Sequence, residues 1–258
     1  MLLDRYNVKV YQAGLKFVLA VAVKNVFNCE VSFPHSLDKG LYTQILSNRQ
    51  LSQFDIDNLK REMDRIIHED IKITKKVVAK NDAYNFYMKN EEEEKAGNIC
   101  NINNKTVTLY ELDGQHNYFM GSMPPSTGKL KYYKLTFLGN NDLVLSVPID
   151  DTGIIPDYVA QEKIFESFRM YHKWIRTLGV KYVYDLNNII SNNKIKDFIK
   201  KNDIMMDNQL YNAAARIKES KKKIILLGGP SSSGKTTSTK KLALFLETFG
   251  LNPIYLGL

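Results

Sequence analysis

The feature that most constrains this chain is a glycine- and serine-rich segment close to its C-terminal end. Residues 229–236 read Gly-Pro-Ser-Ser-Ser-Gly-Lys-Thr, which matches the G-x-x-x-x-G-K-T pattern of phosphate-binding loops. The apolar run Ile224–Leu227 precedes this segment, and a helix-compatible stretch, Thr237–Phe249, follows it. Because such loops join a buried strand to a helix, the context predicts an anion-binding turn.

Each residue type in this loop suits a phosphate ligand. Glycines let the backbone wrap closely around an anion, and the start of the following helix offers free N–H groups. Lys235 is expected to reach the terminal phosphates of a nucleoside triphosphate, and the Thr236 hydroxyl to ligate Mg²⁺. The predicted phosphate-binding residues are Gly229, Pro230, Ser231, Ser232, Ser233, Gly234, Lys235, Thr236 and Thr237. The alternative is a turn that binds no ligand.

Only 23 residues follow Lys235. They suffice for one helix and a second strand, Pro253–Leu256, which would complete a single βαβ unit. No second acid for Mg²⁺, no catalytic base and no acceptor pocket can be assigned among them. The sequence therefore predicts that this chain binds nucleotide phosphate without turnover, with its catalytic residues unknown.

Composition narrows the class of protein further. The 258 residues are 44% hydrophobic and 25% charged, as in ordinary folded proteins. The net charge of +8 is uneven, with +1 on residues 1–150 and +7 on residues 151–258. Cys29 and Cys100 cannot build a disulfide framework, which favours a cytoplasmic location. The longest apolar run, Phe17–Val23, is too short to span a bilayer, so no membrane association is expected.

Hydrophobic periodicity predicts an α+β N-terminal domain followed by helices. Helical spacing covers residues 12–27, and a capping box at Ser52 and Asp55 opens a helix that ends near His68. Short strands are expected near residues 107–109 and 118–121, and a hairpin over residues 131–147. Beyond the connector at 150–157, helices are predicted over 164–178, 193–201 and 208–219.

Three segments follow from this pattern. Residues 1–150 are expected to form the α+β domain, and residues 151–220 a helical connector. Residues 221–258 are expected to form the incomplete start of an α/β phosphate-loop domain, its first βαβ unit.

Several sequence segments resemble a known family. The loop Gly228–Thr237 resembles that of the uridine kinase and phosphoribulokinase group, and the whole chain resembles bacterial uridine kinase-like proteins with a threonyl-tRNA synthetase-like region before the kinase. Within that region, His35–Tyr42 resembles an HS…GLY segment and Pro125–Lys131 a PSTGYLK segment. The runs Asp185–Asn187 and Gly250–Pro253 fall where the family has similar ones.

This resemblance implies an enzyme. The family's activity would be phosphoryl transfer from ATP or GTP, with Mg²⁺, to the 5′-hydroxyl of uridine or cytidine. The expected partners are a nucleoside triphosphate and, in a longer protein, the nucleoside acceptor. The family's Asp-Asp pair would come directly after the second strand, so the chain is expected to stop just before its first catalytic acid.

The synthetase-like region carries a different implication. Editing domains of this type hold a metal ion with an H-x-x-x-H pair on the first helix and a later C-x-x-x-H pair. The positions that align with the first pair are Ala13 and Phe17, and neither Cys29 nor Cys100 has a histidine four residues later. We therefore expect no zinc site and no editing hydrolysis.

Three other residues are candidates for a site in the N-terminal domain: His35, Ser126 and Thr127. His35 lies in a matched segment, with a packing role as its alternative. Ser126 and Thr127 place two hydroxyls in a Gly/Pro-containing segment, where a tight turn is the alternative. The remaining histidines, His68, His116 and His172, are expected to be surface, packing or turn residues.

Two functions from different classes follow. The first is the N-terminal part of an ATP-dependent nucleoside kinase. The second is a binding module for tRNA or a nucleotide, derived from a synthetase editing domain without editing activity, in which the phosphate loop acts as a sensor. Nucleic acid as a partner stays open at this point.

Overall fold

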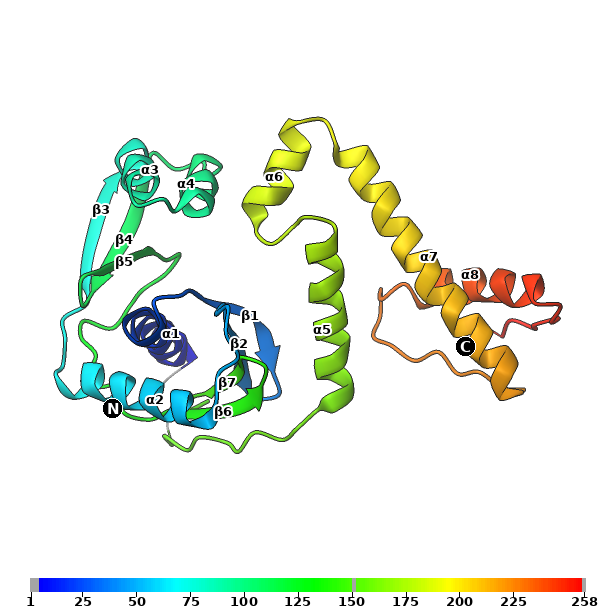
Figure 1. The fold of residues 1–258 in the computed structure, drawn as a ribbon, viewed down its shortest axis with the longest axis horizontal. Coiled ribbons are helices and arrows are strands. Elements are labelled where there is room, and N and C mark those ends of the chain that lie inside the picture. The colour runs from blue at the N-terminus through cyan, green and yellow to red at the C-terminus, as the bar shows by residue number, and fades with distance from the viewer. Residues whose placement is uncertain (1–4, 150–151, 257–258) are drawn as a thin grey trace. The chain divides into compact units, whose positions relative to one another are not determined.

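The structure is a computed structural model that describes residues 5–149 and 152–256. It contains two antiparallel sheets and a succession of helices, so the α+β prediction for the N-terminal part is confirmed (Figure 1). The chain divides into two compact units, Met1–Tyr171 and His172–Leu258. The boundaries expected at residues 150 and 220 stay predictions, because this division does not establish which segments fold alone.

A four-stranded antiparallel sheet in the order β1-β2-β7-β6 organises the first unit. Its strands are β1 (Val31–Leu37), β2 (Gly40–Ile45), β6 (Lys134–Gly139) and β7 (Asp142–Ser146). The predicted hairpin is confirmed as β6–β7, in which Asn140 and Asn141 take the positive φ angles of a tight turn.

The two faces of this sheet are covered differently. Leu41, Leu143 and Leu145 belong to the main core, together with helices α1 (Arg5–Phe27) and α2 (Gln53–His68). On the opposite face, Tyr42 and Val144 pack with the half-buried side chains of Tyr158 and Phe165. Strand alternation places neighbouring residues on opposite faces, which explains why this sheet is apolar on both sides.

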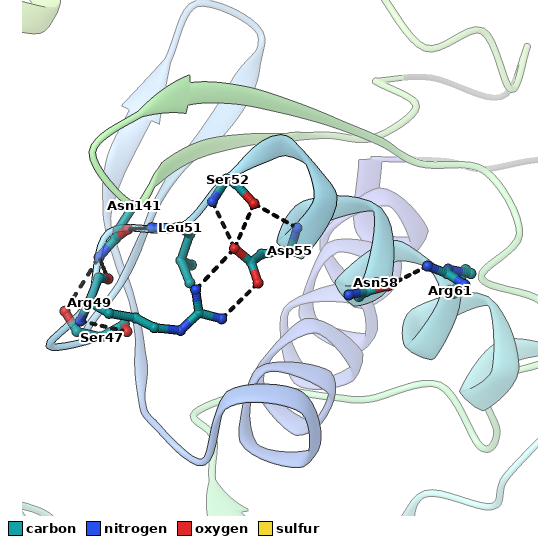
Figure 2. A network of polar contacts seen from close by, with 8 residues as sticks. All are labelled: Ser47, Arg49, Leu51, Ser52, Asp55, Asn58, Arg61 and Asn141. Carbon is teal, nitrogen blue, oxygen red and sulfur yellow. Dashed lines mark hydrogen bonds and ion pairs between the residues drawn. The ribbon is translucent and has the colours of Figure 1, made fainter.

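The start of α2 confirms the predicted capping box. The Ser52 hydroxyl accepts a hydrogen bond from the backbone N–H of Asp55, and the Asp55 carboxylate accepts one from the backbone N–H of Ser52 (Figure 2). Arg49 holds the same carboxylate at 2.7 Å, which together with Ser52 lowers the pKa of Asp55. Asn141 accepts from the backbone N–H of Leu51, so the turn of the β6–β7 hairpin is joined to the entry of α2.

A second, three-stranded antiparallel sheet in the order β3-β4-β5 completes the first unit. Its strands are β3 (Thr74–Ala79), β4 (Thr106–Leu112) and β5 (Gln115–Tyr118), so the strand expected over 118–121 lies earlier in the chain. Helices α3 (Lys80–Lys89) and α4 (Glu93–Cys100) lie at one end of β3 and β4 (Figure 1). Their Tyr87 and Ile99 are buried in a small core with Val107 and Leu109.

Helix α5 (Glu162–Thr177) runs from the first unit into the second, and Gly179 follows it with a φ of 77°. The second unit also contains α6 (Val183–Ser191), α7 (Ile195–Ser220) and α8 (Lys235–Thr248). The prediction of two helices over 193–201 and 208–219 is wrong, because α7 is continuous. Residues 202–207 are helical throughout and none of them is buried, so the polar Asn202, Asp203 and Asp207 lie on the helix without interrupting it.

The expected βαβ unit is not formed either, although its helix is present as α8. Residues 224–227 and 253–256 have no strand pairing, and Leu226 and Ile254 are 87% and 86% exposed. Parallel strands are stable when both faces of their sheet are covered, and the residues described here provide one helix for the purpose. This segment is therefore a helix with extended apolar flanks.

Helix α1 extends well beyond the apolar run Phe17–Val23. Val8–Phe27 is long and apolar enough to cross a membrane, as judged from length and composition. Half of that stretch is buried inside the structure, and Leu15, Val18 and Leu19 lie in the main core. The packing of α1 is that of a core helix.

Candidate functional site

The phosphate loop lies in the second unit, directly before α8. Gly234 is the residue that begins this helix, and its φ of 77° is in the left-handed region that favours glycine. No side chain caps the first turn of α8. The N–H groups of this turn and the positive end of the helix dipole are therefore available to an anion.

Residues at the two ends of the loop lie close together. A Cβ atom on Gly229 would lie 2.8 Å from the Ser233 hydroxyl, so a larger residue at this position would require that hydroxyl to move. The Lys235 ammonium donates to the carbonyl oxygen of Pro230 at 2.5 Å. The cation therefore lies over the loop itself, where a bound phosphate would meet it.

Helix α7 supports α8 from one side. Ala214 of α7 is buried with Leu242 and Leu246 of α8. Tyr211 packs against the rings of Phe245 and Phe249, with centroid distances of 5.9 and 5.1 Å. An ion pair of 2.6 Å joins Asp207 to Lys241. These contacts fix the helix whose first turn faces the loop.

The loop residues fit a triphosphate better than they fit a bare metal ion. The Lys235 ammonium and the N–H groups at the start of α8 are groups that suit phosphate oxygens. Thr236 supplies one hydroxyl for Mg²⁺, and no cluster of three or more His, Cys, Asp or Glu side chains occurs anywhere among the described residues. Mg²⁺ would therefore take most of its ligands from the nucleotide and from water.

In the first unit, the structure places His35 in an aromatic stack. Its ring lies between those of Tyr42 and Phe168, with centroid distances of 4.8 and 3.8 Å and interplanar angles of 20°. Its Nδ1 atom lies 3.0 Å from the carbonyl oxygen of Ser36. This geometry joins α5 to the four-stranded sheet.

Ser126 and Thr127 lie in a turn that closes the end of α2. The buried Thr127 hydroxyl (0% exposed) donates to the Ile66 carbonyl at 2.7 Å, and its backbone N–H donates to the Ile71 carbonyl. The Asp70 carboxylate accepts from the Ser126 side chain and from the Gly128 N–H, and these bonds lower the pKa of Asp70. Both hydroxyls are thus engaged within the domain, and their contacts lie on different elements from those of His35.

Phe17, one of the two positions aligned with the first ligand pair of the editing domains, has an apolar surrounding. Phe17, only 2% exposed, packs against the ring of Phe119 at a centroid distance of 5.2 Å. Phe119 and Met123 both pack against the main core. These two residues are four positions apart, which is the spacing of the second pair of ligands in a C-x-x-x-H motif.

Sequence reasoning missed Phe119 and Met123, because it looked for the second pair only at the two cysteines. Their position just before the matched segment Pro125–Lys131 and their four-residue spacing are the signals that could have found them. Close packing extends to the helix itself, since a Cβ on Gly14 would lie 2.6 Å from Pro124. The space between α1 and this segment is filled by side chains.

Of the other histidines, His116 lies 3.3 Å from the Glu111 carboxylate on the neighbouring strand. His68 is exposed in the last turn of α2, and His172 lies on α5. None of these positions adds a cluster of metal-binding side chains among the described residues.

Threonine–tRNA ligases are similar to this chain. A probable cytoplasmic threonine–tRNA ligase of Enterocytozoon bieneusi is 24% identical over 213 residues, which is 74% of this chain and 33% of the relative. The threonine–tRNA ligase of Burkholderia lata is 30% identical over 134 residues, or 51% of this chain and 21% of the relative. That of Teredinibacter turnerae is 29% identical over 131 residues. No family model matches the chain.

These relatives support a threonyl-tRNA synthetase-like domain in this chain, which spans a fifth to a third of their length. They contradict the prediction of a uridine kinase-like phosphotransferase, because the similarity found is to ligases and nothing found supports a nucleoside kinase. Among the described residues, the strands of a phosphate-loop kinase unit are not formed. The kinase prediction was drawn from the loop motif and its resemblance, and it is wrong.

Proposed function

We propose that the synthetase-like domain of this chain is a tRNA-binding module that has no metal-dependent editing activity. The observation that carries this proposal is the contact between Phe17 and Phe119. Hydrolysis at a metal centre needs ligands and an open coordination position, whereas these two rings and Met123 form part of an apolar core.

A domain that lacks metal ligands can still bind tRNA without hydrolysing an aminoacyl ester. Recognition of tRNA depends on a folded scaffold and on surface cations that contact phosphates, neither of which requires the metal ion. The similarity to threonine–tRNA ligases supports tRNA as the nucleic acid in question.

We further propose that the phosphate loop of the second unit senses a nucleoside triphosphate, ATP or GTP, together with Mg²⁺. Lys235 would bind the terminal phosphates, Thr236 would ligate the metal ion, and residues 229–234 would surround the phosphate chain with backbone N–H groups. When bound, Mg²⁺ would supply charge neutralisation between phosphate oxygens. A cytoplasmic location fits the free thiols of Cys29 and Cys100 and the cytoplasmic ligase among the relatives.

The tRNA proposal is tested by fluorescence anisotropy, with a threonine tRNA transcript titrated against the whole chain at several salt concentrations. We expect binding that weakens as salt rises, because lysine–phosphate contacts release counterions. An affinity that is absent at 50 mM salt, or that does not change with salt, contradicts the proposal.

The nucleotide proposal has its own test, in which binding of a fluorescent ATP analogue is measured with the unmodified chain and two variants. Lys235→Ala is expected to lose affinity by at least tenfold, because it removes a charge-assisted contact to phosphate. Lys240→Ala, which removes an exposed lysine from the same helix, is the matched control and should leave the affinity unchanged. Equal affinities of all three proteins would contradict a phosphate site at this loop.

A further inference from the structure

Three lysines of the first unit gather around the turn that contains Ser126 and Thr127. Lys72 lies between α2 and β3, and it forms an isolated antiparallel bridge with Ser126. Lys129 and Lys131 follow the same turn along the chain, and both act electrostatically on Asp70. We call Lys72, Lys129 and Lys131 the lysine surface.

The charges of the lysine surface are not neutralised within the unit. All three side chains are exposed, and none takes part in an ion pair within the residues that the structure describes. Asp70, on which Lys129 and Lys131 act, already accepts hydrogen bonds from Ser126 and from the Gly128 N–H at 2.6 Å. Glu69, its neighbour, is paired with Arg65 at 2.6 Å. Three lysine cations are therefore exposed to solvent beside the Asp70 carboxylate, which is already hydrogen-bonded to the turn.

The backbone that carries these lysines is rigidly held. Thr127 is bonded to Ile66 and Ile71, and the backbone N–H of Ile73 donates to the Pro125 carbonyl at 2.9 Å. Leu130, between Lys129 and Lys131, is 1% exposed and belongs to the main core. Further along, the backbone N–H of Tyr132 donates to the Tyr11 hydroxyl at 2.8 Å. Because the turn is already ordered, placing three cations against a polyanion costs little backbone entropy.

We propose that the lysine surface binds the phosphate backbone of a folded RNA. This proposal rests on the proposed tRNA-binding function and names the surface that would carry it. Exposed lysines on a fixed turn and on the segment bridged to it can contact several phosphates of a duplex region together. An anionic membrane is the weaker partner, because Leu130, between Lys129 and Lys131, and Ile73, next to Lys72, are buried and cannot act as hydrophobic anchors.

The test compares two triple variants of the whole chain that lose the same charge. One carries Lys72→Gln, Lys129→Gln and Lys131→Gln. The control carries Lys60→Gln, Lys89→Gln and Lys105→Gln, three exposed lysines elsewhere in the same unit. Anisotropy with a threonine tRNA transcript is measured from 50 to 300 mM salt, and thermal melting shows that both variants remain folded.

We expect the first triple variant to bind RNA at least tenfold more weakly. The slope of log affinity against log salt should fall by about 2, since each lost phosphate contact removes roughly 0.7 to 0.9 from it. The control variant should stay within about twofold of the unmodified chain. A third variant with arginine at the three positions of the lysine surface should keep its RNA affinity, because the positive charge is retained.

Other results would overturn the inference in distinguishable ways. If the unmodified chain binds tRNA and the first triple variant binds equally well, the lysine surface is not the contact site, although the tRNA-binding function stands. Equal losses in both triple variants would indicate diffuse charge attraction rather than this surface. If the unmodified chain binds no RNA, the proposed function fails as well. If the substitutions abolish binding to phosphatidylserine vesicles and leave tRNA binding unchanged, the partner is a membrane.

Discussion

The candidate polar residues are packed inside the first unit and exposed in the second. In the first unit, Thr127 is buried and His35 is stacked between two rings, so both are part of the packing. In the second unit, the phosphate loop is exposed, and its main internal contact is that of Lys235 with the Pro230 carbonyl. A hydroxyl or imidazole in a matched motif can therefore be structural, whereas an exposed loop leaves its polar groups accessible to a ligand.

The largest expected effect concerns the apolar replacement of the metal position. Phe17→Ala should lower the free energy of unfolding of the first unit by about 3–5 kcal/mol, because it leaves a cavity beside Phe119. Urea denaturation followed by far-UV circular dichroism measures the change. Phe245→Ala, a substitution of a half-buried ring in the second unit, should leave the transition of the first unit in place and serves as its control.

The next largest effect is expected in the second unit, where a substitution should change ligand binding rather than folding. Lys235→Ala should weaken nucleotide binding by about 1.5–3 kcal/mol and change the melting temperature very little, because the Lys235 side chain is bonded to the exposed loop and not to a core residue in the part of the chain that the structure describes. Isothermal calorimetry and thermal melting of the same samples give both values. A large loss of thermal stability would show that Lys235 is structural, as Thr127 is in the first unit.

Thr127→Val tests whether the Thr127 hydroxyl stabilises the fold rather than contacting a ligand. The substitution removes the hydrogen bond to the Ile66 carbonyl inside the core, and it should cost about 1–3 kcal/mol in the free energy of unfolding. Thr127→Ser keeps the hydroxyl and should cost less. If Thr127→Val is as stable as the unmodified chain and loses tRNA binding instead, the hydroxyl belongs to a contact site.

The smallest effect is expected at the entry of α2. Ser52→Ala should lower the free energy of unfolding by about 1 kcal/mol through loss of the helix cap.

The pKa of Asp55 is lowered in the folded chain, chiefly by Arg49. The contribution of Asp55 to the free energy of unfolding is therefore present above the unfolded pKa of about 3.9 and is lost as pH falls below it. Denaturation at pH 7 and pH 3 should show a smaller acid-induced loss for Asp55→Asn than for the unmodified chain.

Local signals in the sequence predicted part of this structure. The capping box at Ser52 and Asp55 and the Asn-Asn turn of the β6–β7 hairpin depend on residues close in the chain, and both are confirmed. The strand expected at Ile224–Leu227 depends on distant partners, and it is not formed. An apolar run indicates that its side chains favour burial, but it does not determine whether a partner strand is available for pairing.

The candidate sites divide in the same way. Residues 229–236 were recognisable because the loop's geometry follows from its own glycines, with Gly234 at a positive φ. The stacking of His35 on Phe168 and the packing of Phe17 on Phe119 join residues more than 100 positions apart, which no local pattern could predict. The motif alone also led to the wrong enzyme class, because a phosphate loop is shared by many activities.

The central claim is that the synthetase-like domain binds tRNA and does not hydrolyse an aminoacyl ester. The most direct test measures release of a mischarged amino acid from tRNA with Zn²⁺ present, at a concentration of the chain that binds all of the tRNA. The account predicts a release rate equal to that of the same tRNA bound by the chain without Zn²⁺. Zinc-dependent acceleration of this release would contradict it, because it would require an open metal site where Phe17 and Phe119 are in contact.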